Sequence, residues 1–177
     1  SWYGRWGVNY IYGTWQVLRG LRALHINMHQ PWLLKGRAWL ESIQHDDGGW
    51  GERCNTYDDP VFKGQGPSTA SQTAWAVMGL CAFDDPHDEH LRRGIEYLVR
   101  TQNDDGSWSE DEITGTGFPK VFYLKYDIYR NSWPLLALAT FRKLLDRHAA
   151  KHNGHVAAPV SAHTHRLEEA AVPLVER

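Results

Sequence analysis

Residues 35–52 read KGRAWLESIQHDDGGWGE, and residues 93–110 read RGIEYLVRTQNDDGSWSE. The second segment follows the first by 58 residues and aligns with it without a gap. Gly, Leu, Gln, Asp-Asp-Gly, Trp and Glu stand at the same places in both copies. Because a fixed period of this size is typical of repeat architectures, we expect the fold to be built from one repeated unit.

A second recurring element alternates with these segments. Trp15, Trp75 and Trp133 each lie in a stretch that is apolar at i, i+3, i+4 and i+7, which predicts an amphipathic helix. Pro134 is expected in the first turn of the last of these helices, where its missing N–H costs nothing. The repeats themselves start with helical spacing and end near Gln44 and Gln102, where Asp-Asp-Gly predicts a turn. The sequence therefore predicts an all-α fold of helical hairpins, with helices within residues 14–24, 36–43, 74–83, 94–99 and 132–141.

The bulk composition is that of an ordinary globular domain. The chain has 177 residues, 42% hydrophobic and 23% charged, with a formal net charge of −2. Lys and Arg are scattered, so no basic stripe indicates a nucleic-acid partner. Cys54 and Cys81 are isolated, which favours a reducing compartment. The unusual feature is nine Trp, eight Tyr and five Phe, which predicts an aromatic core, a site that uses π faces, or both.

We predict two regions along the chain. Residues 1–146 form one partial helical domain that contains both repeats, and residues 147–177 form a disordered tail without periodicity. His163 and His165 in the tail lack a nearby carboxylate or thiolate, so we predict no metal site there.

The recurring Gln and Trp have a structural interpretation. We expect the amides of Gln44 and Gln102 to bind carbonyls left unpaired at a helix end. Trp50 and Trp108 follow six residues later and can fold back over the helix. We therefore expect these four residues to form a clasp that ties each hairpin to its neighbour, without a catalytic role.

These repeats resemble the QW motifs of the triterpene cyclases: a basic residue, Gly, an aromatic, an aliphatic run, Gln and Gly-x-Trp. Two further segments resemble the C-terminal region of squalene–hopene cyclases, WYGRWGVNYIYG at 2–13 and GTGFPKVFYLKYDIYR at 115–130. The resemblance covers roughly residues 1–146 and implies an α/α toroid of the α6–α6 barrel type, incomplete in this chain. It further implies squalene as the substrate, pentacyclic hopene or hopanol as the product, and no cofactor or metal. Peripheral (monotopic) attachment to the cytoplasmic face of a bacterial membrane and a homodimer are also expected from it.

The resemblance also assigns site residues. Phe118 and Phe122 match the phenylalanines placed against carbocations. The positions that match pocket-lining or substrate-positioning residues are Trp6, Tyr12, Leu124, Tyr126 and Tyr129. From the repeat alone, the loops before 14–24 and 132–141 should emerge at one end of the helices, which would bring their aromatics, Tyr10 included, to one cavity mouth. The pattern within 118–129 fits either a helix or an extended run.

One departure from the family concerns the acid. Class II cyclases begin catalysis with an Asp-x-Asp-Asp motif, and none is present; the chain has only Asp pairs in turns, at 46–47, 58–59, 84–85 and 104–105. The chain therefore resembles the C-terminal third of a cyclase, and we expect it to be inactive alone and to expose apolar surface.

Two other functions remain open at this point. A prenyltransferase-like toroid would need zinc, for which Cys54 with Asp58 or Asp59 offers a start. A non-catalytic repeat scaffold or gene fragment would need no acid motif, but it would also have no need of aromatics gathered in loops at one end.

Overall fold

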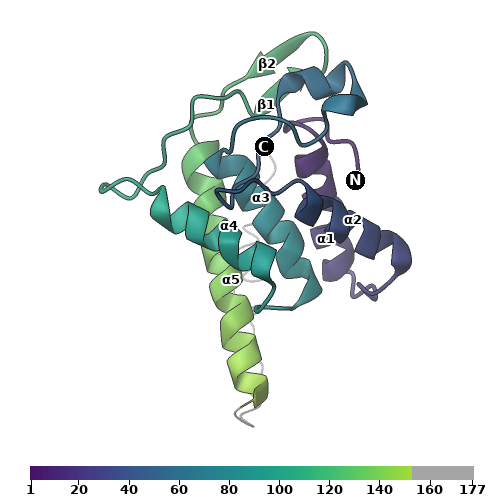
Figure 1. Ribbon diagram of the computed structural model, residues 1–177, viewed down its shortest axis with the longest axis vertical. Helices are drawn as coiled ribbons and strands as arrows, with labels where there is room; N and C mark the ends of the chain where they lie inside the picture. The colour runs from purple at the N-terminus through teal and green to yellow at the C-terminus, as the bar shows by residue number, and fades with distance from the viewer. Residues whose placement is uncertain (153–177) are drawn as a thin grey trace, which may run out of the picture.

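The computed structural model describes residues 1–152, and two types of element carry its architecture: helical hairpins and one small sheet (Figure 1). The five α-helices are α1 (Tyr10–Ala23), α2 (Pro31–Ser42), α3 (Ala70–Leu80), α4 (Glu89–Arg100) and α5 (Tyr129–His152). The sheet pairs β1 (Gly115–Phe118) with β2 (Phe122–Leu124) in antiparallel register. Short 3₁₀ turns lie at Cys54–Tyr57, Pro60–Phe62 and Cys81–Phe83.

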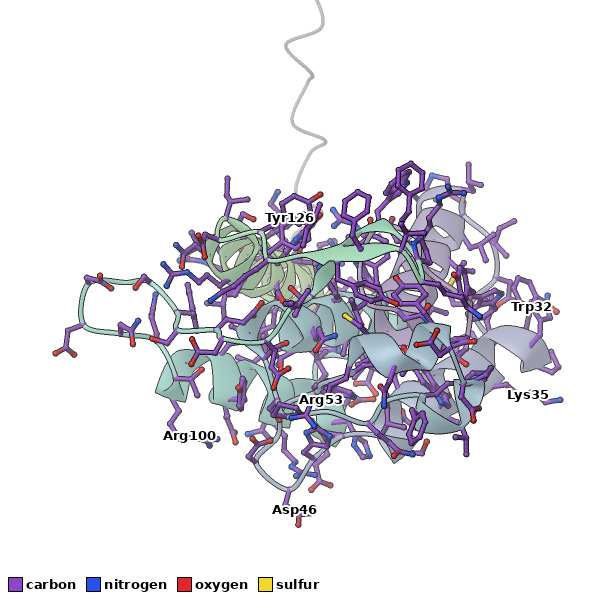
Figure 2. All side chains as sticks on the ribbon, turned by 90° about the horizontal axis from the view of Figure 1, so that it is seen from above. Trp32, Lys35, Asp46, Arg53, Arg100 and Tyr126 are labelled. Atoms are coloured by element: carbon purple, nitrogen blue, oxygen red, sulfur yellow. The ribbon has the colours of Figure 1, made fainter. Side chains whose placement is uncertain are left out.

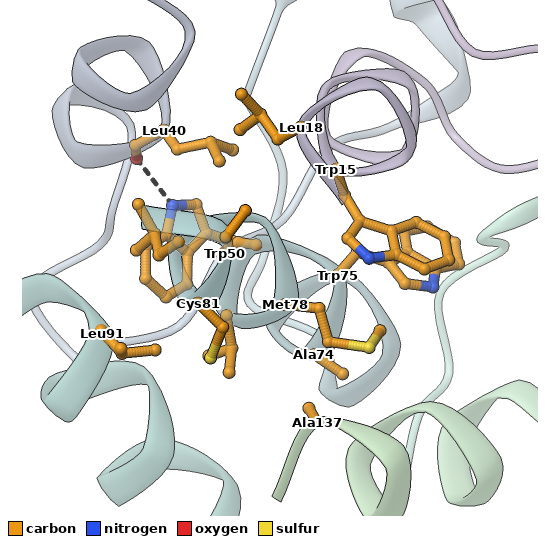
Figure 3. Packing of buried hydrophobic residues seen from close by; sticks show 14 of the residues in the cluster. Trp15, Leu18, Leu40, Trp50, Ala74, Trp75, Met78, Cys81, Leu91 and Ala137 are labelled. Carbon is orange, nitrogen blue, oxygen red and sulfur yellow. Dashed lines mark hydrogen bonds between the residues drawn. The ribbon is translucent and has the colours of Figure 1, made fainter. Parts of the chain in front are cut away.

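The helices form two rows, with α3 at the centre. Helix α3 packs between α1 and α5, and α2 and α4 cover its other side (Figure 3). Every residue of α3 is buried, including Ser71, Gln72 and Thr73. The order α1–α2, α3–α4, α5 is the predicted run of helical hairpins. The fold is therefore part of an α/α toroid, with α1, α3 and α5 as its inner row.

Both tryptophans of the repeats close the end of an outer helix. The indole N–H of Trp50 donates to the Leu40 carbonyl, and that of Trp108 to the Leu98 carbonyl, each at 2.8 Å. Both rings are fully buried. Each tryptophan therefore folds back over the helix of its own repeat and binds a carbonyl that the helix C-terminus leaves unpaired.

The glutamines have different partners from those we expected. The side-chain amide of Gln44 donates to the Gly48 carbonyl and to the His90 carbonyl of α4, both at 2.9 Å. The amide of Gln102 donates to the Gly106 carbonyl at 2.9 Å. Each glutamine thus fixes the Asp-Asp-Gly turn rather than the helix end, because the indole already occupies the helix-end carbonyl. Gln44 also ties the first repeat to α4.

A glutamate completes each clasp. Glu52 is 2% exposed, and one of its carboxylate oxygens accepts the backbone N–H groups of Asn9, Tyr10 and Ile11 at 2.9–3.1 Å. Glu110 accepts the backbone N–H of Ser71 at 2.8 Å. These N–H groups lie at the starts of α1 and α3, where the backbone donors have no acceptor within their own helix. Each repeat therefore holds the start of the preceding inner helix.

Two details differ from the sequence-based expectations, and a third decides between two alternatives that the sequence left open. Helix α5 runs to His152, so the predicted boundary at 146 falls inside a helix. The rest of the predicted tail, residues 153–177 with His163 and His165, lies outside the described residues. Helix α5 also begins at Tyr129, which places Pro134 inside the helix and not in its first turn. Residues 115–124 form a hairpin, so the extended alternative holds up to Leu124.

Candidate functional site

The N-terminal segment pairs with the hairpin, and this pairing brings distant aromatics together. The backbone N–H of Val8 donates to the Thr114 carbonyl at 2.9 Å, and that of Thr116 donates to the Trp6 carbonyl at 3.1 Å. Gly7 and Gly115 form an isolated β-bridge. The segments before α1 and before α5 therefore lie side by side, as expected from the order of the repeats.

Three exposed rings meet on this hairpin, and we call Trp6, Phe118 and Phe122 the hairpin aromatics. Trp6 and Phe118 contact each other edge-to-face at 6.5 Å between centroids, and Phe118 and Phe122 do so at 5.7 Å. Between 44% and 52% of each residue's surface is exposed. The guanidinium of Arg5 lies over the rings of Trp6 and Phe118, at 5.2 and 5.8 Å from their centroids. These two faces therefore already hold a positive charge in the structure.

A second group of rings lies on the inner row. Tyr126 and Tyr129 contact each other at 4.8 Å between centroids. The ring of Tyr129 lies 6.0 Å from Trp75, which is itself 4.9 Å from Tyr12. Burial raises the pKa of the Tyr129 phenol, followed by the influence of Tyr12 and Tyr126, so the hydroxyl stays neutral. Tyr12, Tyr126 and Tyr129 are thus brought together through Trp75.

The glycines of β1 leave space for two of the site's rings. A Cβ on Gly115 would lie 2.4 Å from the ring of Tyr126, and one on Gly117 would lie 2.0 Å from the ring of Phe122. Leu124 pairs with Gly115 in the sheet register and is half-buried. The hairpin therefore fixes the places of three predicted site residues, Phe122, Leu124 and Tyr126.

Two tyrosines expected in the loop before the first helix lie inside α1 instead. Tyr10 is its first residue, and Tyr12 follows within the first turn. Tyr10 faces Tyr3 at 6.0 Å and the ammonium of Lys63 at 4.2 Å from the centroid of its ring. Tyr10 therefore contacts Tyr3 at the N-terminus, whereas Tyr12 contacts Trp75 in the inner row.

The candidate acids lie in turns or bind the starts of helices. All four Asp pairs lie in turns or at helix ends, and the turn that carries Asp46 sits at the edge of the molecule opposite Tyr126 (Figure 2). Among residues 1–152, the two deeply buried glutamates are Glu52 and Glu110, and both bind helix N-termini. Burial raises the pKa of each, and hydrogen bonds offset only part of the rise. Sequence reasoning missed this role, although the glutamate recurs in both repeats.

Residues 1–152 contain no group of three or more His, Cys, Asp or Glu side chains that could hold a metal ion. Cys54, the candidate zinc ligand, donates its thiol to the Ile113 carbonyl, and burial raises its pKa to about 11. Across the same residues, each helix is too short or too polar to span a bilayer.

Known proteins resemble the chain along most of its length. A family profile described as squalene-hopene cyclase C-terminal domain matches residues 1–143. The chain belongs to this family. A squalene–hopene cyclase of Bradyrhizobium diazoefficiens is 50% identical over 146 residues, and one of Alicyclobacillus acidocaldarius is 50% identical over 147 residues. A dammaradiene synthase of Dryopteris crassirhizoma is 46% identical over 158 residues.

These alignments cover 81–83% of the chain but only 22–23% of each relative. The chain thus spans less than a quarter of the length of these members of the squalene–hopene cyclase C-terminal domain family. The sequence-based resemblance to terpene cyclases is confirmed, and the zinc-dependent prenyltransferase alternative is not supported.

Proposed function

We propose that the chain forms part of the pocket wall of a terpene cyclase that converts squalene to hopene or hopanol. In this proposal the hairpin aromatics face the substrate, with Phe118 and Phe122 against carbocations and Trp6 beside them. Tyr12, Leu124, Tyr126 and Tyr129 shape the adjoining wall. The observation that carries the proposal is the guanidinium of Arg5 over the faces of Trp6 and Phe118.

The chemistry suits these residues. Protonation of a terminal alkene starts a ring-forming cascade in which positive charge moves along the hydrocarbon. A carboxylate beside such a cation would capture it or remove a proton, whereas a ring face stabilises the charge without reacting. Each face contributes about 0.5–1 kcal/mol at an exposed site and about 2 kcal/mol or more when it is shielded from water. Several faces on one wall can therefore lower the barrier to successive ring closures.

The sequence contains no Asp-x-Asp-Asp motif. The Asp pairs lie in turns, and the two buried glutamates have raised pKa values, which makes them weaker acids. We therefore propose that the proton comes from a part of the enzyme outside these 177 residues and that the isolated chain is inactive. Peripheral attachment to the cytoplasmic face of a membrane and a homodimer stay proposals that rest on the family resemblance.

A chimera tests the proposal. Residues 1–143 of this chain would replace the matching segment of the Alicyclobacillus acidocaldarius enzyme. The chimeric protein would then be incubated with squalene in detergent. We expect cyclised triterpenes by gas chromatography, and no turnover from the isolated chain. A chimera that folds as the parent enzyme does, judged by circular dichroism and thermal unfolding, but converts no squalene would contradict the proposal and favour a non-catalytic scaffold.

A further inference from the structure

The three tryptophans that recur in the inner helices meet at one place. Trp15, Trp75 and Trp133 come from α1, α3 and α5 respectively. The rings of Trp15 and Trp75 stack at 6.3 Å with an angle of 10° between their planes, and Trp133 meets both edge-on, at 5.1 and 6.2 Å. Trp15 and Trp75 point away from α2 and α4, while Trp50 fills the opposite side of α3 (Figure 3).

Trp75 contacts two of the tyrosines that we propose for the pocket wall, Tyr12 and Tyr129. Its ring contacts Tyr12 of α1 at 4.9 Å and Tyr129 of α5 at 6.0 Å, with interplanar angles of 75° and 79°. Each tyrosine also contacts the tryptophan of its own helix, Trp15 at 5.5 Å and Trp133 at 5.8 Å. Trp75 is fully buried, whereas both tyrosines are half-buried. Two indoles therefore hold each tyrosine ring, and Trp75 is the one that both share.

The indole of Trp75 acts through its shape and not through a hydrogen bond. Its N–H is buried and has no hydrogen-bond partner among the described residues. In contrast, the N–H groups of Trp50 and Trp108 bind main-chain carbonyls. A Phe at position 75 would thus remove no hydrogen bond and would leave no new polar group unpaired. It would, however, shorten the ring that spans the distance between Tyr12 and Tyr129.

We propose that Trp75 is a positioning residue of the cyclisation pocket, which fixes the rings of Tyr12 and Tyr129 relative to each other across α1 and α5. This inference rests on the proposed function, because it assigns Trp75 a part in the shape of the same pocket. Edge-to-face contacts set the tilt of each ring, and the tilt sets where the wall presses on a folding hydrocarbon. A loosened wall would release partly cyclised intermediates, since positioning at the ångström scale governs rate.

The first test uses Trp75→Phe in the chimera, with Trp32→Phe as the matched control. Trp32 lies on α2 in the outer row and is 47% exposed. We expect Trp75→Phe to lower kcat by about tenfold with little change in KM, and to raise the share of incompletely cyclised products. Trp32→Phe should leave both unchanged. An unaltered rate and product spectrum for Trp75→Phe would overturn the inference while the proposed function stands.

A second test reads ring position without turnover. The full chain would be labelled with 3-fluorotyrosine and studied by ¹⁹F NMR, with Tyr97 on α4 as the internal control. We expect Trp75→Phe to shift and broaden the signals of Tyr12 and Tyr129 and to leave that of Tyr97 unchanged. Unshifted signals for the two pocket tyrosines would refute the positioning role. An unmodified chimera that folds but makes no product would instead refute the proposed function, and with it the catalytic part of the inference.

Discussion

The indole N–H of Trp50 donates to the main-chain carbonyl of Leu40, ten residues earlier, at 2.8 Å. The same bond joins Trp108 to Leu98 at the same distance. In both repeats the loop that follows an outer helix thus returns to close the end of that helix. The two copies of the motif therefore have one structural meaning, which can be tested on stability alone.

Trp50→Phe should destabilise the chain by about 1–3 kcal/mol, because it leaves the Leu40 carbonyl without its donor in a buried place. Trp32→Phe, on the exposed side of α2, should change the free energy of unfolding by less than about 0.5 kcal/mol. Urea unfolding followed by circular dichroism measures both. Equal stability of the two variants would show that the Trp50 bond does not hold the clasp.

The glycine of the second repeat permits close packing between repeats. A Cβ on Gly94 would lie 2.7 Å from both the Trp50 ring and a Val77 methyl group. Gly94→Ala should therefore cost about 1–3 kcal/mol through overpacking. Gly20→Ala is the matched control, since Gly20 also lies in a helix but has open space at its Cβ position. That change should stabilise the chain by about 0.5–1 kcal/mol. Thermal unfolding that moves both variants in the same direction would contradict this account.

The buried glutamates predict how stability depends on pH. Burial raises the pKa of Glu52 above its ordinary value of 4.5, so the folded chain binds more protons than the unfolded chain over the interval above that value. The free energy of unfolding should therefore fall as the pH rises through this interval, and Glu110 should contribute in the same direction. Asp84 and Asp105 have pKa values lowered from 3.8, so they change the free energy of unfolding only at pH values below about 3.8 and leave the interval above 4.5 to the glutamates.

Glu52→Gln should make this decline shallower, because the amide does not titrate. Urea unfolding at a series of pH values, with the unmodified chain as the control, measures the difference in slope. A decline that is as steep in Glu52→Gln as in the unmodified chain would mean that Glu52 titrates alike in both states.

Local pattern was sufficient to predict the order of the helices. The apolar spacing around Trp15, Trp75 and Trp133 and the turns after Gln44 and Gln102 are local signals, and the structure confirms the hairpins. The partners of the glutamates could not be predicted in this way. Glu52 binds the first turn of α1, more than forty residues earlier, and a single repeat carries no sign of that contact.

The hairpin was ambiguous for a related reason. Residues 118, 122, 126 and 129 fit a helical period, while 122, 124 and 126 fit a strand. The strands are short, and β1 gains a further partner when Thr116 and Thr114 bind the backbone of Trp6 and Val8. This pairing is non-local, so periodicity could not decide between the two structures. The convergence of Trp6 with Phe118 followed from the repeat order. The contacts of Trp75 with Tyr12 and Tyr129 join three helices that are distant in the sequence, so local pattern could not predict them.

The most direct test of the account is the product spectrum of the chimera with Phe122→Ala, compared with Val121→Ala. Val121 lies at the hairpin turn and is 75% exposed, so its loss should leave rate and products unchanged. Loss of the Phe122 ring should slow the formation of pentacyclic product by about 2- to 30-fold and increase products that stop after fewer rings. An identical rate and product spectrum for the two variants, in protein folded as the unmodified chimera, would contradict the claim that the hairpin aromatics stabilise carbocations.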